Sequence, residues 1–469
     1  MGGPRRGGVY VSSGRLHPSS PGFLRLYGLA FLFFSANSVL TVMLPLLSSQ
    51  EGFGEAEIGL MMGSYMLTCM LLRPLAGQLI GRHGPLAVMR WLLAAHAVSL
   101  ALYAVAGAEQ FTGLRIVQGA VTAFFSMTMQ TGIVEGLEER DRAQGLSLYT
   151  LSTMVPSLIG PIVAVELWQN GDRLLLAAVL LALALLPLLL GLGAPLARRG
   201  AADRSYTLLD LGRSLRQVRG SRPLQASMAV MLCASFGFGA TATFLPLSMM
   251  KDGSGHAGLY LMLQGAVVVA CRFVLRKRIP SDGSWSGPLV SGLMLCAAAG
   301  FAMLALSGSL GGWVYVSALF GGLAMALLYP TLVTYLSFAL PGPSKYVLMG
   351  LFLSSYDLGF SLGGLGMGWL VQASSYSTMY AACALISLVG CAAALRHGGA
   401  RKRGAVGSAG ERGAAGSAPE RGVDGSAGSG ASERGVAASA PERGADGSAG
   451  ERGAAADAAA SGDGHPPVR

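Results

Sequence analysis

Residues 174–192 read LLLAAVLLALALLPLLLGL, an apolar run of 19 residues without one charged side chain. A helix of about 20 such residues spans the hydrocarbon core of a bilayer. Across the whole chain of 469 residues, 52% are hydrophobic and only 12% are charged, which is too apolar for an average water-soluble protein. The sequence therefore predicts an integral membrane protein built from helices of this kind.

The pattern repeats along the 396 residues that precede His397. That length accommodates twelve helices of about 20 residues with short connections. We predict an all-α polytopic membrane protein with transmembrane helices at 23–47, 57–80, 86–106, 111–134, 143–167, 173–195, 223–250, 256–276, 287–308, 312–340, 346–372 and 375–396.

Basic residues between the apolar runs predict the orientation. Alternate connections hold arginine or lysine, with seven arginines at 197–222, whereas the other connections hold only Arg173 and Lys251. By the positive-inside rule both termini are cytoplasmic. The same distribution explains the net charge of +10 without a nucleic-acid partner. None of the lysines lies in a GxxxxGK[ST] loop, the motif that binds the phosphates of ATP. Any transport by this chain must therefore draw on a gradient rather than on ATP.

The basic stretch divides the chain into halves that repeat weakly at an offset of about 200 residues. Pro45-Leu46 matches Pro246-Leu247, and Arg73 with Gly84 matches Arg272 with Gly283. Two such halves are typical of six-plus-six secondary transporters. The tail is rich in Ala, Gly and Ser, lacks aromatic residues and is expected to be disordered. The expected segments are a cytoplasmic N-terminus (1–22), a first half (23–196), a linker (197–222), a second half (223–396) and the tail (397–469).

Two predicted helices carry polar side chains at helical spacing. Because such groups are costly in hydrocarbon, we expect them to face a shared cavity. The stripe in 57–80 consists of Tyr65, Cys69 and Arg73, and the stripe in 111–134 consists of Arg115, Gln118, Thr122, Ser126 and Gln130.

Asp357 lies about eleven residues, or roughly 17 Å, from the cytoplasmic end of the predicted helix 346–372, near the bilayer midplane. An ionised carboxylate there is expensive unless an arginine pairs with it. A carboxylate poised between its protonated and ionised states can bind and release a proton. Asp357 is therefore the expected proton-coupling residue. A fixed salt bridge is the open alternative.

Structural roles also stay open for the arginines. Arg73 and Arg115 can lock helices together rather than bind substrate. Arg272 lies four residues before Arg276, close enough to the membrane surface to reach it, so we expect it to serve topology.

Two motifs resemble those of the major facilitator superfamily. The segment from Pro156 to Pro161 resembles the Gly-Pro motif of its antiporter branch. The segment GQLIGRHG at 77–84 resembles its signature loop, except that Gly81 stands where an aspartate is usual. The resemblance implies gating or structural roles for Gly77, Arg82, Gly84, Pro156, Gly160 and Pro161.

A finer resemblance is carried by segments that include 23–27 (FLRLY), 33–37 (FFSAN), 65–68 (YMLT), 115–127 (RIVQGAVTAFFSM), 158–161 (LIGP), 329–332 (YPTL), 335–338 (YLSF) and 357–364 (DLGFSLGG). In these segments the chain resembles the exporters of nicotianamine-like opine metallophores, such as staphylopine and bacillopaline. This resemblance implies export of the metal-free metallophore across the bacterial cell membrane. We expect a monomer without a cofactor, and no resident metal, because the six cysteines form no CxxC pair and have no partnered histidine cluster.

Such a substrate carries several carboxylates and amines. Arginine forks at Arg73 and Arg115 are therefore candidates for the carboxylates, and Asp357 for an amine. The other expected substrate-binding residues are Asn37, Tyr65, Gln118, Gln130, Tyr149 and Tyr329.

Two other classes of protein are alternatives. A drug or sugar-efflux facilitator of the same fold would have a more aromatic cavity with less arginine. An intramembrane enzyme is disfavoured, because no HExxH pair or GxSxG elbow occurs in any predicted helix.

The arginine distribution makes a direct prediction about topology. A reporter fused after Arg396 should be active only if it works inside the cell, because this end is expected to be cytoplasmic. Labelling of that position by a reagent that cannot cross the membrane would contradict the orientation.

Overall fold

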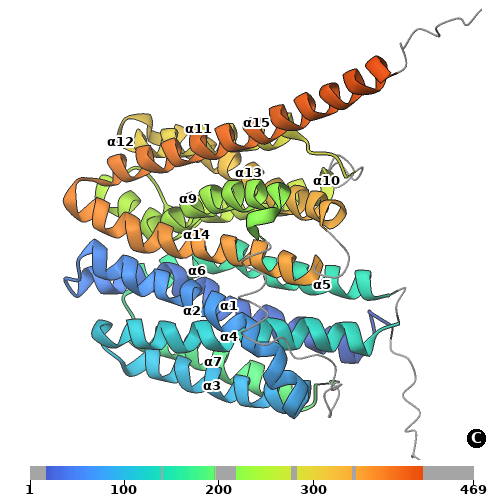
Figure 1. The fold of residues 1–469 in the computed structure, drawn as a ribbon. Helices are drawn as coiled ribbons and strands as arrows, with labels where there is room; N and C mark the ends of the chain where they lie inside the picture. Colours follow the sequence, from blue (N-terminus) through green and yellow to red (C-terminus); the bar gives the residue numbers. More distant parts are fainter. Residues whose placement is uncertain are drawn as a thin grey trace, which may run out of the picture. The chain divides into compact units, whose positions relative to one another are not determined.

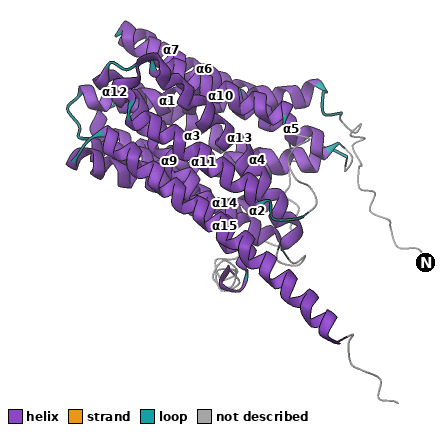
Figure 2. Cartoon of the chain, turned by 90° about the horizontal axis from the view of Figure 1, so that it is seen from above, coloured by secondary structure: helices purple, strands orange, loops and turns teal. Residues whose placement is uncertain are grey.

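The computed structural model describes residues 17–138, 141–194, 196, 218–275, 283–340 and 345–415, and these residues form helices joined by short connections without any strand (Figure 2). The all-α prediction is confirmed. Most of the predicted linker, at 197–217, and most of the predicted tail, at 416–469, lie outside the described residues.

The helices fall into two sets on either side of the bundle (Figure 1). The first set consists of α1 (Pro21–Gln50), α2 (Glu55–His83), α3 (Pro85–Val105), α4 (Ala108–Gly136), α5 (Arg142–Met154), α6 (Pro156–Asn170) and α7 (Arg173–Leu192). The second set consists of α9 (Arg222–Asp252), α10 (Ala257–Val274), α11 (Gly287–Ala305), α12 (Ser307–Leu310), the 3-10 turn η2 (Gly311–Trp313), α13 (Val314–Ala339), α14 (Lys345–Ala373) and α15 (Tyr376–Ala415).

Within the described ranges, nine helical segments are long and apolar enough to cross a membrane, with α5–α6 and α12–α13 each counted as one. Three more helices, α2, α4 and α14, have 29 residues each and are long enough to cross as well. They are the helices that carry Arg73, Arg115 and Asp357. The total of twelve transmembrane helices therefore stays a prediction.

Two boundaries differ from the sequence prediction. The single helix expected at 143–167 is divided into α5 and α6 at Val155, because Pro156 has no N–H and its ring disfavours a continuous helix. The last helix was expected to end at 396, yet α15 continues to Ala415. The part of the tail at 397–415, which we expected to be disordered, is therefore helical, although its six glycines, which are poor helix formers, outnumber its five alanines.

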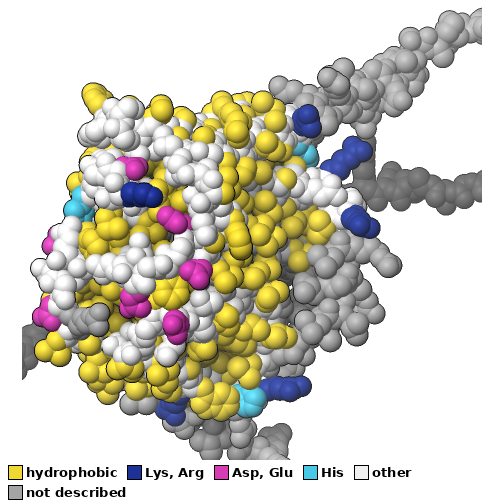
Figure 3. Space-filling model, turned by 90° about the vertical axis from the view of Figure 1, so that its left-hand side faces the viewer, with side chains coloured by type: hydrophobic (Ala, Val, Ile, Leu, Met, Phe, Trp, Pro, Cys, Tyr) yellow, Lys and Arg dark blue, Asp and Glu magenta, His cyan; other side chains and the backbone are white. Residues whose placement is uncertain are grey.

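Exposed apolar side chains cover the outside of the bundle. On α7, Leu174 is 79% exposed and Leu189 is 61% exposed, as expected for a helix that faces lipid. Figure 3 looks onto one end of the bundle, where acidic side chains are scattered over a largely apolar surface. Glu51 after α1 and Glu57 in the first turn of α2 lie together at one such end, because only residues 51–54 connect these helices.

The two sets of helices meet along two main seams, and α1 also contacts α9. In the first seam α2 packs on α14, and in the second seam α6 packs on α10. Glycines line both: Gly59 lies directly against the backbone of Gly364, and a Cβ added at Gly258 would lie 3.0 Å from the carbonyl oxygen of Pro161. The Ser361 hydroxyl of α14 also donates a hydrogen bond to the carbonyl of Gly63 at 2.8 Å. Small residues of this kind let two helix backbones approach closely in a membrane.

Gly59→Ala should destabilise the protein by about 1–3 kcal/mol, because the added methyl group meets backbone atoms of α14 that cannot move independently. Gly113→Ala is the matched control, since nothing lies within 4 Å of a Cβ added there and alanine favours a helix. Thermal unfolding in detergent measures both variants. Equal unfolding midpoints would contradict the tight first seam.

Candidate functional site

An ion pair joins the two halves across the first seam. Arg73 Nη2 on α2 lies 2.9 Å from Asp357 Oδ2 on α14, and the Asp357 side chain is only 3% exposed. The Arg73 guanidinium also approaches Cys69 Sγ at 3.7 Å. Because its two charges belong to different halves, the pair can persist only while α2 and α14 stay together at this level. Separation would leave a buried carboxylate without its counterion.

Arg115 on α4 forms a second group, which lies within the first half. Its side chain is 0% exposed, and its Nη1 donates to Asn37 Oδ1 at 3.2 Å and to Gln118 Oε1 at 3.1 Å. The guanidinium carbon lies 5.2 Å from the centre of the Tyr65 ring. No carboxylate of the described residues lies within the 4 Å of an ion pair, so neutral dipoles and an aromatic face stabilise this cation.

The same group is extended by tyrosine hydroxyls. Tyr65 donates to Thr122 Oγ1 at 3.1 Å, and Tyr103 donates to Gln118 Oε1 at 3.4 Å. Two buried nitrogens, Arg115 Nε and Gln118 Nε2, have no hydrogen-bond partner among the residues described. This group therefore retains donors that a ligand could engage after a modest movement.

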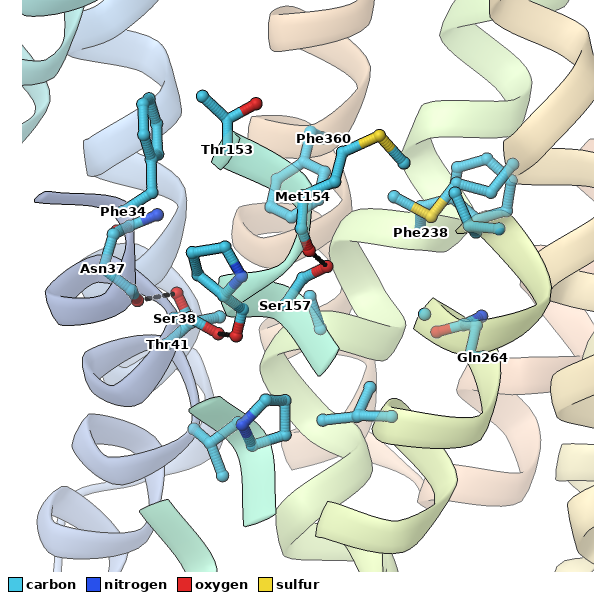
Figure 4. Close-up of a pocket in the computed structure, with 18 of the residues that line it drawn as sticks. Phe34, Asn37, Ser38, Thr41, Thr153, Met154, Ser157, Phe238, Gln264 and Phe360 are labelled. Atoms are coloured by element: carbon cyan, nitrogen blue, oxygen red, sulfur yellow. Dashed lines mark hydrogen bonds between the residues drawn. The ribbon is translucent and has the colours of Figure 1, made fainter. Parts of the chain in front are cut away.

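A cavity of about 340 Å³ lies between the halves. Figure 4 shows its polar and aromatic lining, with Asn37, Ser38 and Thr41 of α1 on one side and Gln264 of α10 on the other. The hydroxyls of Ser38 and Thr41 donate to the carbonyls of Pro156 at 2.9 Å and of Asn37 at 2.7 Å. The remaining lining residues include Phe34, Thr153, Met154, Ser157, Phe238, Arg272, Met325 and Phe360.

The predicted substrate-binding residues are divided among these places. Asn37 belongs both to the cavity and to the Arg115 group, which also contains Tyr65 and Gln118. Tyr329 on α13 is half-buried, stacks on Phe352 with ring centres 6.1 Å apart and interacts electrostatically with the charges of Arg73 and Asp357.

The polar stripe of α4 does not stay in one environment. Arg115, Gln118 and Thr122 are buried, whereas Gln130 is exposed. Gln130 instead lies within hydrogen-bonding reach of Tyr149, a buried residue of α5. The structure does not bring Gln130 and Tyr149 into the Arg115 group.

The residues expected to have structural roles lie at bends and close contacts. Gly84 joins α2 to α3 with a φ of 81°, a conformation that glycine adopts without strain. Pro156 begins α6, and a Cβ added at Gly160 would lie 2.6 Å from Cβ of Ser38 on α1. Pro161 contacts Gly258 in the second seam. Arg82 is exposed near the end of α2, and Gly77 lies within α2, where its surroundings are not described.

Six polar residues of the cavity were not predicted as site residues, namely Ser38, Thr41, Thr153, Ser157, Gln264 and Arg272. Arg272 was assigned to topology, and Gln264 was not singled out, yet both line the cavity from α10. A signal for Arg272 was present in the sequence, since it matches Arg73 in the internal repeat.

Comparisons with known proteins agree with this architecture. The model of the Major Facilitator Superfamily matches residues 26–284. The staphylopine export protein of Staphylococcus aureus is 41% identical over 372 residues, which cover 78% of this chain and 94% of that protein.

Solved structures with low sequence identity share the fold. The nucleoside transporter NupG superposes with a TM-score of 0.64 at 16% identity, covering 81% of this chain and 99% of that chain. The human organic anion transporter MFSD10 (TETRAN) superposes with a TM-score of 0.59 at 19% identity, covering 80% and 100%. With its helices, its two seams and these matches, the chain is a multi-pass membrane protein that belongs to the Major Facilitator Superfamily.

Proposed function

We propose that this protein exports the metal-free form of a staphylopine-type opine metallophore from the bacterial cytoplasm, in exchange for protons. The observation that carries the proposal is the 41% identity to the staphylopine export protein over 94% of its length. Membership of a transporter family also makes a transport role, rather than enzymatic catalysis, the relevant one.

The cavity suits a small molecule with both acidic and basic groups. Its volume of about 340 Å³ lies at the lower end of the range for small-molecule sites. Asn37 provides a link from the cavity to Arg115, because its Oδ1 accepts a hydrogen bond from the arginine. A substrate amine that took this oxygen would release a donor of Arg115, which could then turn to a substrate carboxylate.

Proton coupling is assigned to Asp357. While the first seam is closed, Arg73 stabilises the ionised carboxylate at 2.9 Å. If the halves move apart at this level, the carboxylate loses its counterion in a buried site and takes up a proton. Renewed pairing with Arg73 expels that proton. Alternation between these two states couples proton movement to the motion of the halves.

A second candidate function is efflux of apolar drugs. Three phenylalanines, Phe34, Phe238 and Phe360, line the cavity, and aromatic walls suit apolar ligands. The two candidates differ in what accumulates in cells that lack the protein.

Cells without this protein should accumulate the opine metallophore internally and release little of it, because no route out remains. Arg115→Ala should reproduce the defect at normal protein level, since it removes the buried cation next to the cavity. Mass spectrometry of cell extracts and medium measures both. Unchanged release together with increased sensitivity to drugs would favour the second candidate.

Asp357→Asn should abolish export driven by a pH gradient while leaving exchange of substrate across the membrane intact. The amide keeps the volume of the side chain but cannot release a proton. Uptake of labelled staphylopine into inside-out vesicles should fall to the level measured without a gradient.

Glu109→Gln is the matched control, because Glu109 is exposed at the start of α4. It makes the same chemical change away from the seam and should preserve gradient-driven uptake. If Asp357→Asn preserved it as well, Asp357 would be a structural ion-pair partner only.

A further inference from the structure

Arg272 is the one charged side chain among the described residues that line the cavity. Its Nη1 lies 3.1 Å from Met154 Sδ on α5, in the other half. Its buried Nε has no hydrogen-bond partner in the part of the chain that the structure describes. No carboxylate of the described residues lies within ion-pair distance, and its electrostatic neighbours are Tyr329 and Tyr356.

The internal repeat makes Arg272 the counterpart of Arg73. Gly59 precedes Arg73 by 14 residues, and Gly258 precedes Arg272 by 14 residues. Both glycines lie in seams between the halves, Gly59 in the first and Gly258 in the second. The two arginines therefore occupy equivalent positions on α2 and α10.

The same relation identifies the residue that corresponds to Asp357. Gly59 contacts Gly364, which follows Asp357 by seven residues, and Gly258 contacts Pro161, which follows Met154 by seven residues. Arg73 pairs with Asp357, and Arg272 contacts Met154. Met154 thus stands where the first seam has its carboxylate.

Arg272 therefore has no carboxylate partner among the described residues at the edge of the cavity. A thioether is only a weak hydrogen-bond acceptor, and a charge that is partly withdrawn from water is stabilised by a partner of opposite sign. We infer that Arg272 binds a carboxylate of the exported substrate, which takes the place that Asp357 has at Arg73. The inference rests on the proposed function and specifies how the cavity recognises its substrate.

The surroundings of Arg272 define the rest of the recognised group. Gln264 lies eight residues earlier on α10, about two turns away on the same face, and also lines the cavity. Asn37 faces it from α1, so amide oxygens are available for an amine near the bound carboxylate (Figure 4). The cavity therefore fits an amino-carboxylate group, with Phe238 and Phe360 against its apolar part.

Binding of staphylopine to the purified full-length protein tests the inference. Arg272→Gln should weaken binding by about ten- to a hundredfold, the effect of losing one charge-assisted hydrogen-bonded contact. Arg222→Gln is the matched control, because Arg222 is exposed at the start of α9, away from the cavity, and should bind like the unmodified protein.

Arg272→Lys separates recognition from topology. Lysine keeps the positive charge that topology requires but lacks the planar fork that binds a carboxylate with two donors. Binding should therefore weaken while the protein inserts normally. Full affinity in both Arg272→Lys and Arg272→Gln would overturn the inference.

Substitutions at Met154 provide a test that retains Arg272. Met154→Glu supplies the missing carboxylate within hydrogen-bonding reach of the arginine, so it should compete with the substrate. Met154→Gln has nearly the same shape without the charge. Binding should be at least about tenfold weaker in the Glu variant than in the Gln variant, and equal binding would contradict the inference.

The outcomes distinguish this inference from the proposed function. If the unmodified protein binds staphylopine and the Arg272 variants bind equally well, the function stands and the role of Arg272 is wrong. If the unmodified protein does not bind staphylopine, the proposed substrate is wrong, and the inference fails with it. Elution of each variant as a single folded species in size-exclusion chromatography excludes misfolding as the cause.

Discussion

A charge removed from water must meet an opposite charge or a set of oriented dipoles, and this constraint organises the interior of the bundle. Three arginines differ in how far the described residues satisfy this constraint. Arg73 has a carboxylate partner in the opposite half, and Arg115 is surrounded by amides and an aromatic ring in its own half. Arg272 has neither among the described residues, and it is the arginine that lines the cavity. The three arginines thus differ in their partners, and this difference is the basis of the roles proposed for them.

The partners of Arg73 and Arg272 depend on the conformation of the protein, because both arginines lie in seams between the halves. Glycine contacts hold α2 near α14 and α6 near α10, and they place an arginine in each seam. In the first seam the counterion is part of the chain. In the second seam the facing residue is Met154, and under our inference the substrate supplies the partner. Similar backbones therefore give the two seams different chemistry.

Much of the fold could be predicted from the sequence, because hydrophobic length and charge placement act locally. The run at 174–192 predicted α7, and Pro156 marked a site of bending. The pairing of Asp357 could not be predicted, because helical spacing defines the face of a helix but not the helix that packs on it. The stripe of α4 showed the same limit: Gln130 has the correct spacing, yet it is exposed. Arg272 was expected to serve topology because of its distance from the helix end, yet it lines the cavity and matches Arg73 in the internal repeat.

The unpartnered charge of Arg272 has a consequence for energy conservation. An exporter that changed conformation while empty would let protons through without moving cargo and would dissipate the gradient. An empty cavity that holds an uncompensated cation resists enclosure between the halves, because enclosure would remove the water that stabilises that charge. A bound carboxylate removes this penalty. Under the inferred role of Arg272, the methionine at 154 makes slippage unfavourable, and the cargo supplies the charge that permits the transport cycle to proceed.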